Sequence, residues 1–185
     1  MITVVSATNR SGNRTRIFAR CFVRLLREAG AEAQLLDLTA VGPACFGTAM
    51  YDPAAMAPEL VELQDEYVLA ADKFAFFVPE YNGSYPGILK LFIDGISVRE
   101  TAASFGGKTA ALVGIASGRA GNLRGMDHLA DALNHMGCWT LPGKLPISAI
   151  HRVLTDDAVT DEATLTALSQ LASQLIAAVN RKDIR

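Results

Sequence analysis

The sequence is poor in cysteine and in charge of either sign. Among its 185 residues are three cysteines, Cys21, Cys45 and Cys138, which lie far apart and form no C-x-x-C pair. This spacing argues against a disulfide framework and favours free thiols in a reducing compartment. Charged residues make up 19% of the chain, and 17 basic against 19 acidic residues leave a net charge of −2. That balance argues against general binding to nucleic acid or to anionic membranes.

Long hydrophobic runs are also missing, because the longest uncharged stretches carry glycine, serine and proline. No membrane-spanning segment is therefore expected. The opening residues, Met1 followed by ITVVS, are typical of a strand and not of a targeting leader. Half of the residues are nevertheless hydrophobic, as in folded globular proteins. We expect a cytoplasmic protein with one domain over residues 1–185, which needs no structural metal.

What is present is an alternation of short apolar segments with amphipathic ones. Strands are expected at Ile2–Ser6, Ala33–Leu38, Phe74–Val78 and Thr109–Ala116, with a weaker edge strand within Trp139–Ile147. Helices are expected at Arg14–Ala29, Pro58–Ala70, Pro86–Ile96, Leu123–Met136 and Asp161–Asn180. Apolar strands that alternate with helices predict a parallel sheet covered on both faces. The expected fold class is α/β, a three-layer doubly wound five-stranded parallel sheet.

Such sheets bind ligands at the carboxyl ends of their strands, where the strand order reverses. The loop at 7–13 reaches this edge and leads into a helix, whose free amides attract anions. Around that helix start the sequence supplies hydroxyl, amide and guanidinium groups, on Thr8, Asn9, Arg10, Asn13, Arg14 and Thr15. This equipment fits one phosphate monoester. The alternative is an ordinary polar loop in which Asn13 caps the helix.

Two further loops, at 79–85 and 117–122, are expected at the same edge of the sheet. The first offers two tyrosines, an amide and a glycine between stiff prolines, and could give a planar ligand an aromatic wall. Alternatively, its tyrosines only cover the edge of the sheet. The second carries two glycines that permit close backbone approach, together with one cation, Arg119.

No group of side chains in the sequence supports catalysis by the polypeptide itself. The segment Gly106–Thr109 is similar to the end of a P-loop, but it precedes a strand and lacks the first glycine of that motif. His128 and His135 are seven residues apart and could share a helix face, but no constellation of carboxylates or thiols accompanies them, so no metal site is expected. A site with phosphate-binding and ring-binding features but no catalytic side chain predicts that a cofactor carries the chemistry.

Two motifs indicate which cofactor this is. The segment from Pro79 reads PEYNGSYPG and continues with Leu89-Lys90 and Ile93-Asp94, and the first loop, from Ser6, reads SATNRSGNRT. These motifs resemble those of the NADPH-dependent FMN reductase family. This flavodoxin-like group includes azoreductases, quinone reductases and chromate-reducing enzymes, and the order of elements agrees along nearly the whole chain.

The resemblance implies a flavodoxin-like fold with FMN as cofactor and NADPH or NADH as co-substrate. Hydride would pass from NAD(P)H through FMN to a small-molecule acceptor: a quinone, an azo compound, a flavin or a metal ion. The implied phosphate site comprises Thr8, Asn9, Arg10, Asn13 and Thr15. Pro79, Glu80, Tyr81, Asn82 and Gly83 would border the isoalloxazine ring, and Ser117 and Gly118 would close the site. Arg14 and Arg119 are candidates for the extra phosphate of NADPH.

Two departures from the family pattern leave other functions open. Ala7 stands where the family has glycine, and its methyl group would crowd the phosphate if the position required an unusual backbone angle. Asn13 stands where a serine is common. The alternatives are a flavodoxin-type electron carrier, which would need a separate reductase, and a binding or regulatory module that has lost the flavin.

The expected helix after Pro86 also bears on assembly, because its apolar residues lie on nearly all sides: Ile88, Leu89, Leu91, Phe92, Ile93, Ile96 and Val98. One contact with a sheet cannot bury every side of a helix. We therefore expect a homodimer, or a dimer of dimers, in which part of this helix packs against another subunit. The alternative is coverage by the connection at 42–58.

Overall fold

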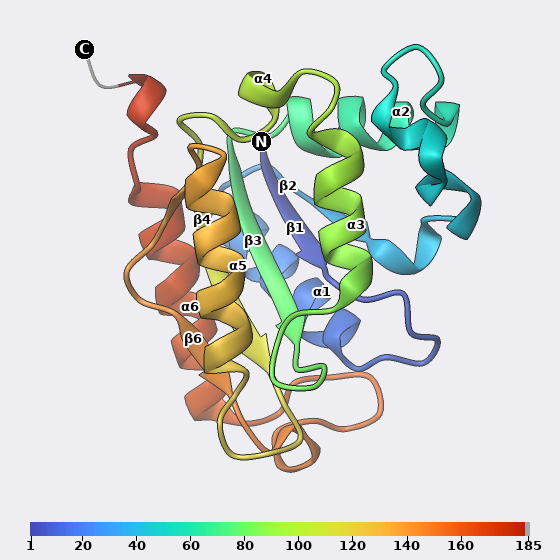
Figure 1. The fold of residues 1–185 in the computed structure, drawn as a ribbon. Helices are drawn as coiled ribbons and strands as arrows, with labels where there is room; N and C mark the ends of the chain where they lie inside the picture. Colours follow the sequence, from blue (N-terminus) through green and yellow to red (C-terminus); the bar gives the residue numbers. More distant parts are fainter. Residues whose placement is uncertain (184–185) are drawn as a thin grey trace.

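A parallel sheet lies between two layers of helices in the computed structural model, which describes residues 1–183 (Figure 1). Its strands are β1 (Ile2–Ser6), β2 (Ala33–Asp37), β3 (Lys73–Pro79), β4 (Thr109–Ile115), β5 (Trp139–Thr140) and β6 (Leu145–Ile147). The strand order is β2-β1-β3-β4-β5, with β6 also paired to β4, and every pairing is parallel. The doubly wound α/β fold predicted from the sequence is confirmed.

The fifth position of the sheet is occupied by two short strands instead of one. Strand β5 pairs with the start of β4, and β6 pairs with its end. Pro142 lies between the two strands and Pro146 lies within β6. Because proline has no amide hydrogen to donate to a ladder, it interrupts strands and is tolerated mainly at sheet edges. The weak edge strand expected over Trp139–Ile147 is therefore broken in its middle.

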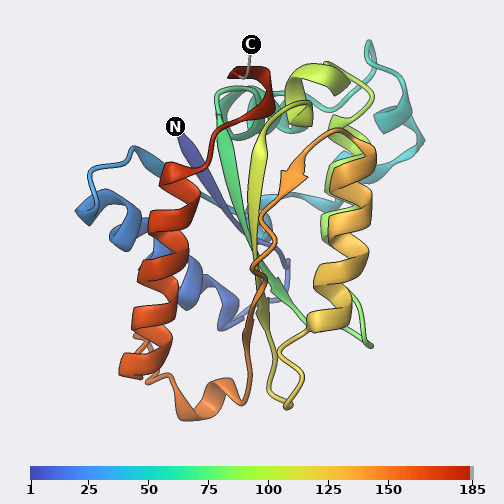
Figure 2. The same cartoon turned by 90° about the vertical axis from the view of Figure 1, so that its left-hand side faces the viewer.

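The helices divide between the two faces of the sheet (Figure 2). Helices α1 (Thr15–Glu28) and α6 (Glu162–Ala177) pack together on one face, and α3 (Gly87–Ile96) and α5 (Leu123–His135) cover the other. A short helix, α4 (Thr101–Phe105), precedes β4. No helix among the described residues has the length and apolar character required to cross a bilayer.

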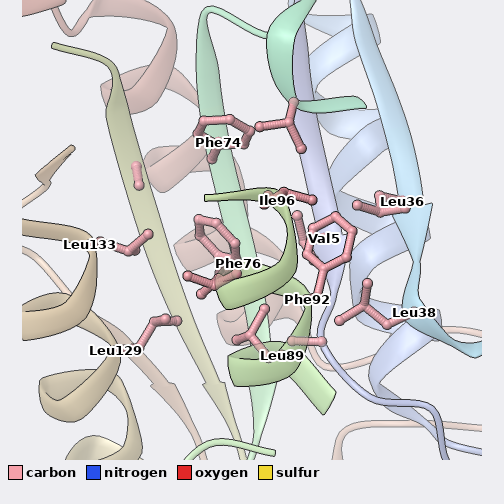
Figure 3. Close-up of a cluster of buried hydrophobic side chains, with 14 of the residues drawn as sticks. Val5, Leu36, Leu38, Phe74, Phe76, Leu89, Phe92, Ile96, Leu129 and Leu133 are labelled. Carbon is pink, nitrogen blue, oxygen red and sulfur yellow. The ribbon is translucent and has the colours of Figure 1, made fainter. Parts of the chain in front are cut away.

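Each face of the sheet has its own hydrophobic core because successive side chains of a strand point to opposite faces. Phe74 and Phe76 of β3 pack with Val5 toward α3 and α5, where Figure 3 shows them among leucine and isoleucine side chains. Phe77, on the other face, joins the cluster under α1 and α6. The two central strands, β3 and β4, are consequently apolar after their first residues.

The helix expected from Pro58 to Ala70 changes its geometry midway. Helix α2 (Pro58–Leu63) is α-helical, and Gln64–Leu69 continues it as a π-helix. The buried Gln64 amide donates to the carbonyl oxygen of Ile96 at 2.8 Å and to the Ser104 hydroxyl at 2.9 Å. These bonds reach groups more than thirty residues away, so they could not be predicted from the local sequence.

Helix α3 is covered mainly by its own chain, as the alternative of coverage by the connection at 42–58 supposed. Its apolar side chains Ile88, Leu89, Phe92, Ile93 and Ile96 are all buried. The cover comes from the β2–β3 connection, whose Cys45 and Met56 share the same buried cluster. Of the apolar residues within α3, Leu91 alone is exposed, at 40%.

Candidate functional site

A cleft of about 590 Å³ opens at the carboxyl ends of β1, β3 and β4, at the end of the sheet opposite the N-terminus (Figure 1). Strand β1 pairs with β2 on one side and β3 on the other, so this is where the strand order reverses and where such folds bind ligands. The volume lies within the range of about 300–1,000 Å³ typical of small-molecule sites.

Nearly all of the predicted site residues line this cleft: Thr8, Arg10, Asn13, Arg14, Thr15, Pro79, Glu80, Tyr81, Asn82, Gly83, Ser117 and Gly118. Asn9 is the exception. It borders a neighbouring hollow of about 550 Å³, which shares Arg10, Glu80, Tyr81 and Asn82 with the cleft. The three loops chosen from the sequence do therefore meet.

Ile150 lines the cleft from a fourth segment, which was not predicted from the sequence. It follows β6, whose carboxyl end reaches the same edge of the sheet. Because parallel strands end at the same edge of the sheet, the loop after the fifth strand was predictable in the same way as the other three. The structure also adds Ser11, Gly12, Ile115 and Ala116 to the lining, all of which adjoin predicted segments.

One end of the cleft is built to receive an anion. Thr8 and Thr15 are buried at the start of α1, while the Arg10 and Arg14 side chains are exposed beside them. The backbone amides of Gly12 and Arg14 donate to none of the described residues. Amides at the start of a helix, with its positive dipole end, form an anion site that the two guanidinium groups strengthen.

Asn13 holds the shape of this loop. Its Oδ1 accepts a hydrogen bond from the Arg16 amide at 3.0 Å, and its Nδ2 donates to the Arg10 carbonyl oxygen at 2.9 Å. The side chain thus satisfies a free amide at the start of α1, as the capping alternative supposed. Because an amide nitrogen carries two hydrogens, one donor is left for a ligand, and the two roles are compatible.

Ala7 does not crowd this end of the cleft through backbone strain. Its backbone lies outside the left-handed region, and its amide donates to the Phe77 carbonyl oxygen at 3.0 Å. The methyl group is buried in the core on the side of α3 and α5. An ordinary backbone angle removes the reason for requiring glycine at this position.

The opposite wall of the cleft is a tight turn at Tyr81–Ser84. The amide of each of these two residues donates to the carbonyl oxygen of the other at 3.0 Å. Asn82 and Gly83 between them have φ angles of +51° and +76°. Two successive left-handed residues are the pattern of a type I′ hairpin turn, for which Asn-Gly is the favoured pair.

Side chains on both sides hold this turn in place. The Tyr81 hydroxyl lies 2.6 Å from Thr8 Oγ1, and Thr8 Oγ1 also accepts the Arg10 amide at 3.2 Å. On the other side, the Ser84 hydroxyl lies 2.9 Å from Nδ1 of His128 on α5. The histidine left without a role by the sequence analysis therefore supports the turn, through a contact between residues 44 positions apart.

The third wall, the loop at 117–122, folds back onto the strand that precedes it. A Cβ atom on Gly114 would overlap the carbonyl oxygen of Gly121, so the close approach requires glycine at 114. On the far side, the Ala149 amide donates to the Gly118 carbonyl oxygen at 3.0 Å, and the Ser148 hydroxyl donates to the Arg119 carbonyl oxygen at 2.7 Å. The loop is therefore fixed at several points.

No group of three or more histidine, cysteine, aspartate or glutamate side chains in the described part of the chain could hold a metal ion. The cleft thus offers hydrogen-bond donors, cations and an aromatic ring, and none of its lining residues forms a paired nucleophile and base. This composition suits the binding of an anionic, partly aromatic molecule.

Comparison with known proteins gives concordant results. A family model described as NADPH-dependent FMN reductase matches residues 1–152. An NAD(P)H-dependent FMN reductase from Pseudomonas aeruginosa is 43% identical over 76 residues, which is 41% of this chain and 40% of that relative. The match thus spans less than half of the relative's length.

Solved structures agree over a greater length. The flavoenzyme NAD(P)H:(acceptor) oxidoreductase from Paracoccus denitrificans superposes with a TM-score of 0.75 and 25% identity, covering 95% of this chain and 94% of that one. The apo form of an NADH:FMN oxidoreductase has a TM-score of 0.72 and 19% identity, with coverage of 100% and 96%. At that identity the second likeness concerns the fold alone.

Proposed function

Because the chain belongs to the NADPH-dependent FMN reductase family, we propose that it binds FMN in the cleft and passes hydride from NAD(P)H to a small-molecule acceptor. The observation that carries this proposal is that one cleft has an anion-binding end and, opposite it, a wall that contains an aromatic side chain. The start of α1 provides amides, hydroxyls and guanidinium groups, and the turn at 81–84 provides an aromatic side chain and exposed polar groups.

The donor set at the start of α1 fits the phosphate of FMN. A phosphate monoester carries close to two negative charges near pH 7 and accepts several hydrogen bonds. The cleft provides two arginines, two buried threonine hydroxyls and unused backbone amides as donors for these hydrogen bonds. We assign the phosphate to Thr8, Arg10, Asn13 and Thr15, with Arg14 beside it, and place Asn9 at the edge of the site.

The walls at 79–83 and 117–118 fit a planar ring system. The Pro79 ring is buried and Tyr81 is half-buried, while Asn82, Ser117 and Gly118 are exposed at the mouth of the cleft. A ring held between these walls would keep one side accessible to solvent, which a hydride donor and then an acceptor require. We assign Pro79, Glu80, Tyr81, Asn82, Gly83, Ser117 and Gly118 to the border of the ring.

When bound, FMN supplies the hydride chemistry that none of the lining side chains offers. The residues of this chain would bind the cofactor and orient it. The left-handed turn at Asn82–Gly83 is fixed by its own backbone pair, and the Tyr81–Thr8 hydrogen bond joins the ring wall to the phosphate loop. Such preorganisation holds a ligand in one pose at little entropic cost.

The acceptor we propose is a planar or small oxidant: a quinone, an azo compound, a free flavin or a metal ion. The family membership and the accessible mouth of the cleft support this class. The class of acceptor is therefore proposed from access to the mouth of the cleft and not from recognition of one particular acceptor.

The experiment that tests the proposal is a visible absorption spectrum of the purified protein, loaded with FMN, desalted and then mixed with NADPH without oxygen. A retained flavin spectrum that bleaches with NADPH is expected. A retained flavin that stays oxidised with both NADPH and NADH would instead indicate an electron carrier. If desalting removed the flavin and a titration showed no saturable binding, the FMN assignment would be overturned.

We also propose that the protein forms a homodimer. Two exposed side chains support this: Leu91 on α3, which is 40% exposed, and Tyr51 of the β2–β3 connection, which is 62% exposed. Both lie near Lys90, whose pKa is raised mainly by its hydrogen bond to Asp94 and to a smaller extent by Tyr51. The surface offered to a partner is smaller than the sequence predicted, because the connection covers the remainder of the helix.

A further inference from the structure

Asn122 joins two walls of the cleft without lining it. The residue lies at the junction between the loop at 117–122 and helix α5, and its side chain is 1% exposed. Its Nδ2 donates to the carbonyl oxygen of Val78 at 3.0 Å. Val78 is the residue before Pro79, where the wall at 79–83 begins. One buried amide thus connects the loop after β4 to the end of β3.

The conformation of Asn122 is unfavourable in two respects. Its φ angle of +57° places it in the left-handed region, which few residues other than glycine adopt and which asparagine tolerates best. Its Oδ1 atom is buried and has no hydrogen-bond partner among the described residues. Residues that combine backbone strain with an unpartnered polar atom persist when the surrounding structure holds them, and they concentrate at functional sites.

The neighbouring residues make room for this side chain. A Cβ atom on Gly125 would overlap Oδ1 of Asn122, so the glycine in the first turn of α5 leaves the space that the amide occupies. The Asn122 carbonyl oxygen also accepts the Met126 amide at 3.0 Å, which starts the helix. The side chain is therefore confined, and its hydrogen bond to Val78 has a fixed length and direction.

We propose that Asn122 is a positioning residue, which sets the separation between the wall at 79–83 and the backbone of Ser117–Gly118. Ser148 and Ala149 hold the loop at 117–122 from its far side, and Asn122 holds it against β3. This inference rests on the proposed function, in which the flavin ring lies between these two walls. Loss of the amide donor would free the loop and weaken binding of FMN.

The substitution Asn122→Asp tests this role with little change in shape. Aspartate tolerates the left-handed conformation, but an ionised carboxylate cannot donate to the Val78 carbonyl oxygen. At about pH 8 we expect the Kd for FMN to rise about tenfold relative to wild type. Burial favours the neutral carboxyl group, and its hydroxyl can donate. Lowering the pH to about 5.5 should therefore return the Kd toward the wild-type value at that pH.

Asn180→Asp provides the matched control. Asn180 is also a buried asparagine with an unpartnered Oδ1, but it follows α6 at the opposite end of the sheet. The end of α6 lies beside the start of β3, because Nζ of Lys73, the first residue of that strand, donates to the carbonyl oxygens of Leu175 and Ile176. This variant should lower the melting temperature without changing the Kd for FMN. If both variants weakened FMN binding equally, or if Asn122→Asp weakened it equally at both pH values, the positioning role would be overturned.

Hydrogen exchange of the protein without flavin separates this inference from the proposed function. At about pH 8, the backbone amides of residues 80–83 and 117–121 should exchange faster in Asn122→Asp than in wild type and in Asn180→Asp. Unchanged exchange in these two segments would contradict the role of Asn122 even if FMN binds. If wild type bound no FMN, the proposed function would fail, and the exchange result alone would decide the inference.

Discussion

At the residue scale, the site depends on side chains whose partners the sequence could only partly predict. Thr8, Arg10 and Tyr81 were chosen from their loops and do meet in one cleft. The hydrogen bond between Thr8 and Tyr81 joins residues 73 positions apart and could not be read from either motif. Asn122 was overlooked for the same reason, because its backbone strain and its bond to Val78 exist only in the folded chain.

Arg10→Ala should weaken FMN binding. The Arg10 guanidinium is exposed beside the helix start and forms no ion pair with any described residue, so it is available to a phosphate. We expect a loss of about 1.5–3 kcal/mol in binding free energy, as for a charge-assisted hydrogen bond. Fluorescence titration of the flavin-free protein with FMN measures this change. Arg20→Ala, an exposed arginine in the middle of α1, serves as the control, and equal affinities for the two variants would contradict the phosphate assignment.

The three thiols should differ sharply in reactivity. Burial raises the pKa of Cys138 to about 12. The pKa of Cys45 is raised to about 11 by burial and by a hydrogen bond from its thiol to the Glu59 carboxylate at 3.2 Å. Cys21 is half-buried. Since the thiolate is the reactive form, a disulfide reagent at about pH 8 should modify Cys21 first. Cys21→Ser should abolish the fast phase, and all three thiols should react in denaturant.

At the scale of single elements, helices and strands that depend on their own residues were predicted correctly, and those that depend on distant contacts were not. Strands β1, β3 and β4 were predicted to within a residue because burial on both faces makes them continuously apolar. The π-helix at 64–69 was not predicted; the side chain of Gln64, its first residue, bonds to Ile96 and Ser104, which are distant in sequence. Helix α3 was located correctly, yet its cover could not be predicted from its own residues.

The start of helix α6 should make stability depend on pH. Hydrogen bonds from the Thr164 hydroxyl and amide lower the pKa of Asp161, which caps the helix. A carboxyl group whose pKa is lower in the folded state stabilises that state above its unfolded pKa, and this contribution disappears as the pH falls through the folded pKa.

The melting temperature of Asp161→Ala should therefore lie below that of wild type at about pH 7, and the difference should shrink below about pH 4. Asp161→Asn, which can cap the helix without titrating, should lie between the two at neutral pH. Thermal unfolding followed by circular dichroism gives these values. A difference between wild type and Asp161→Ala of the same size at both pH values would refute the linkage.

At the scale of the whole molecule, the doubly wound topology brings the residues that line the cleft together. Four connections that are distant in sequence reach one edge of the sheet because parallel strands end on the same side. This general property allowed three of the four segments to be predicted from the sequence. Assembly is less determined, because the apolar residues that indicated a second subunit are mostly buried within the chain.

Leu91→Asp should abolish the proposed dimer. Leu91 is 40% exposed in the middle of α3, and an aspartate there would place an unpaired charge in a buried interface. Sedimentation velocity should show a dimer for wild type and a monomer for this variant. Val179→Asp, at a 65% exposed position beyond α6, should leave the dimer intact. A wild-type protein that sediments as a monomer at every concentration would remove the proposal.

The hydrogen bond between Thr8 and Tyr81 joins two walls of the cleft, and its donor and acceptor can exchange. Either oxygen can be the donor while no ligand is bound, and Thr8 already accepts the Arg10 amide. In the proposed site, a phosphate at the start of α1 would accept a hydrogen bond from the Thr8 hydroxyl. Tyr81 must then donate to Thr8, and the chain of hydroxyls becomes polarised from the ring wall toward the phosphate. In the proposed site, binding of the phosphate end of FMN would thus fix the direction of the hydrogen bond that Tyr81 makes at the ring end.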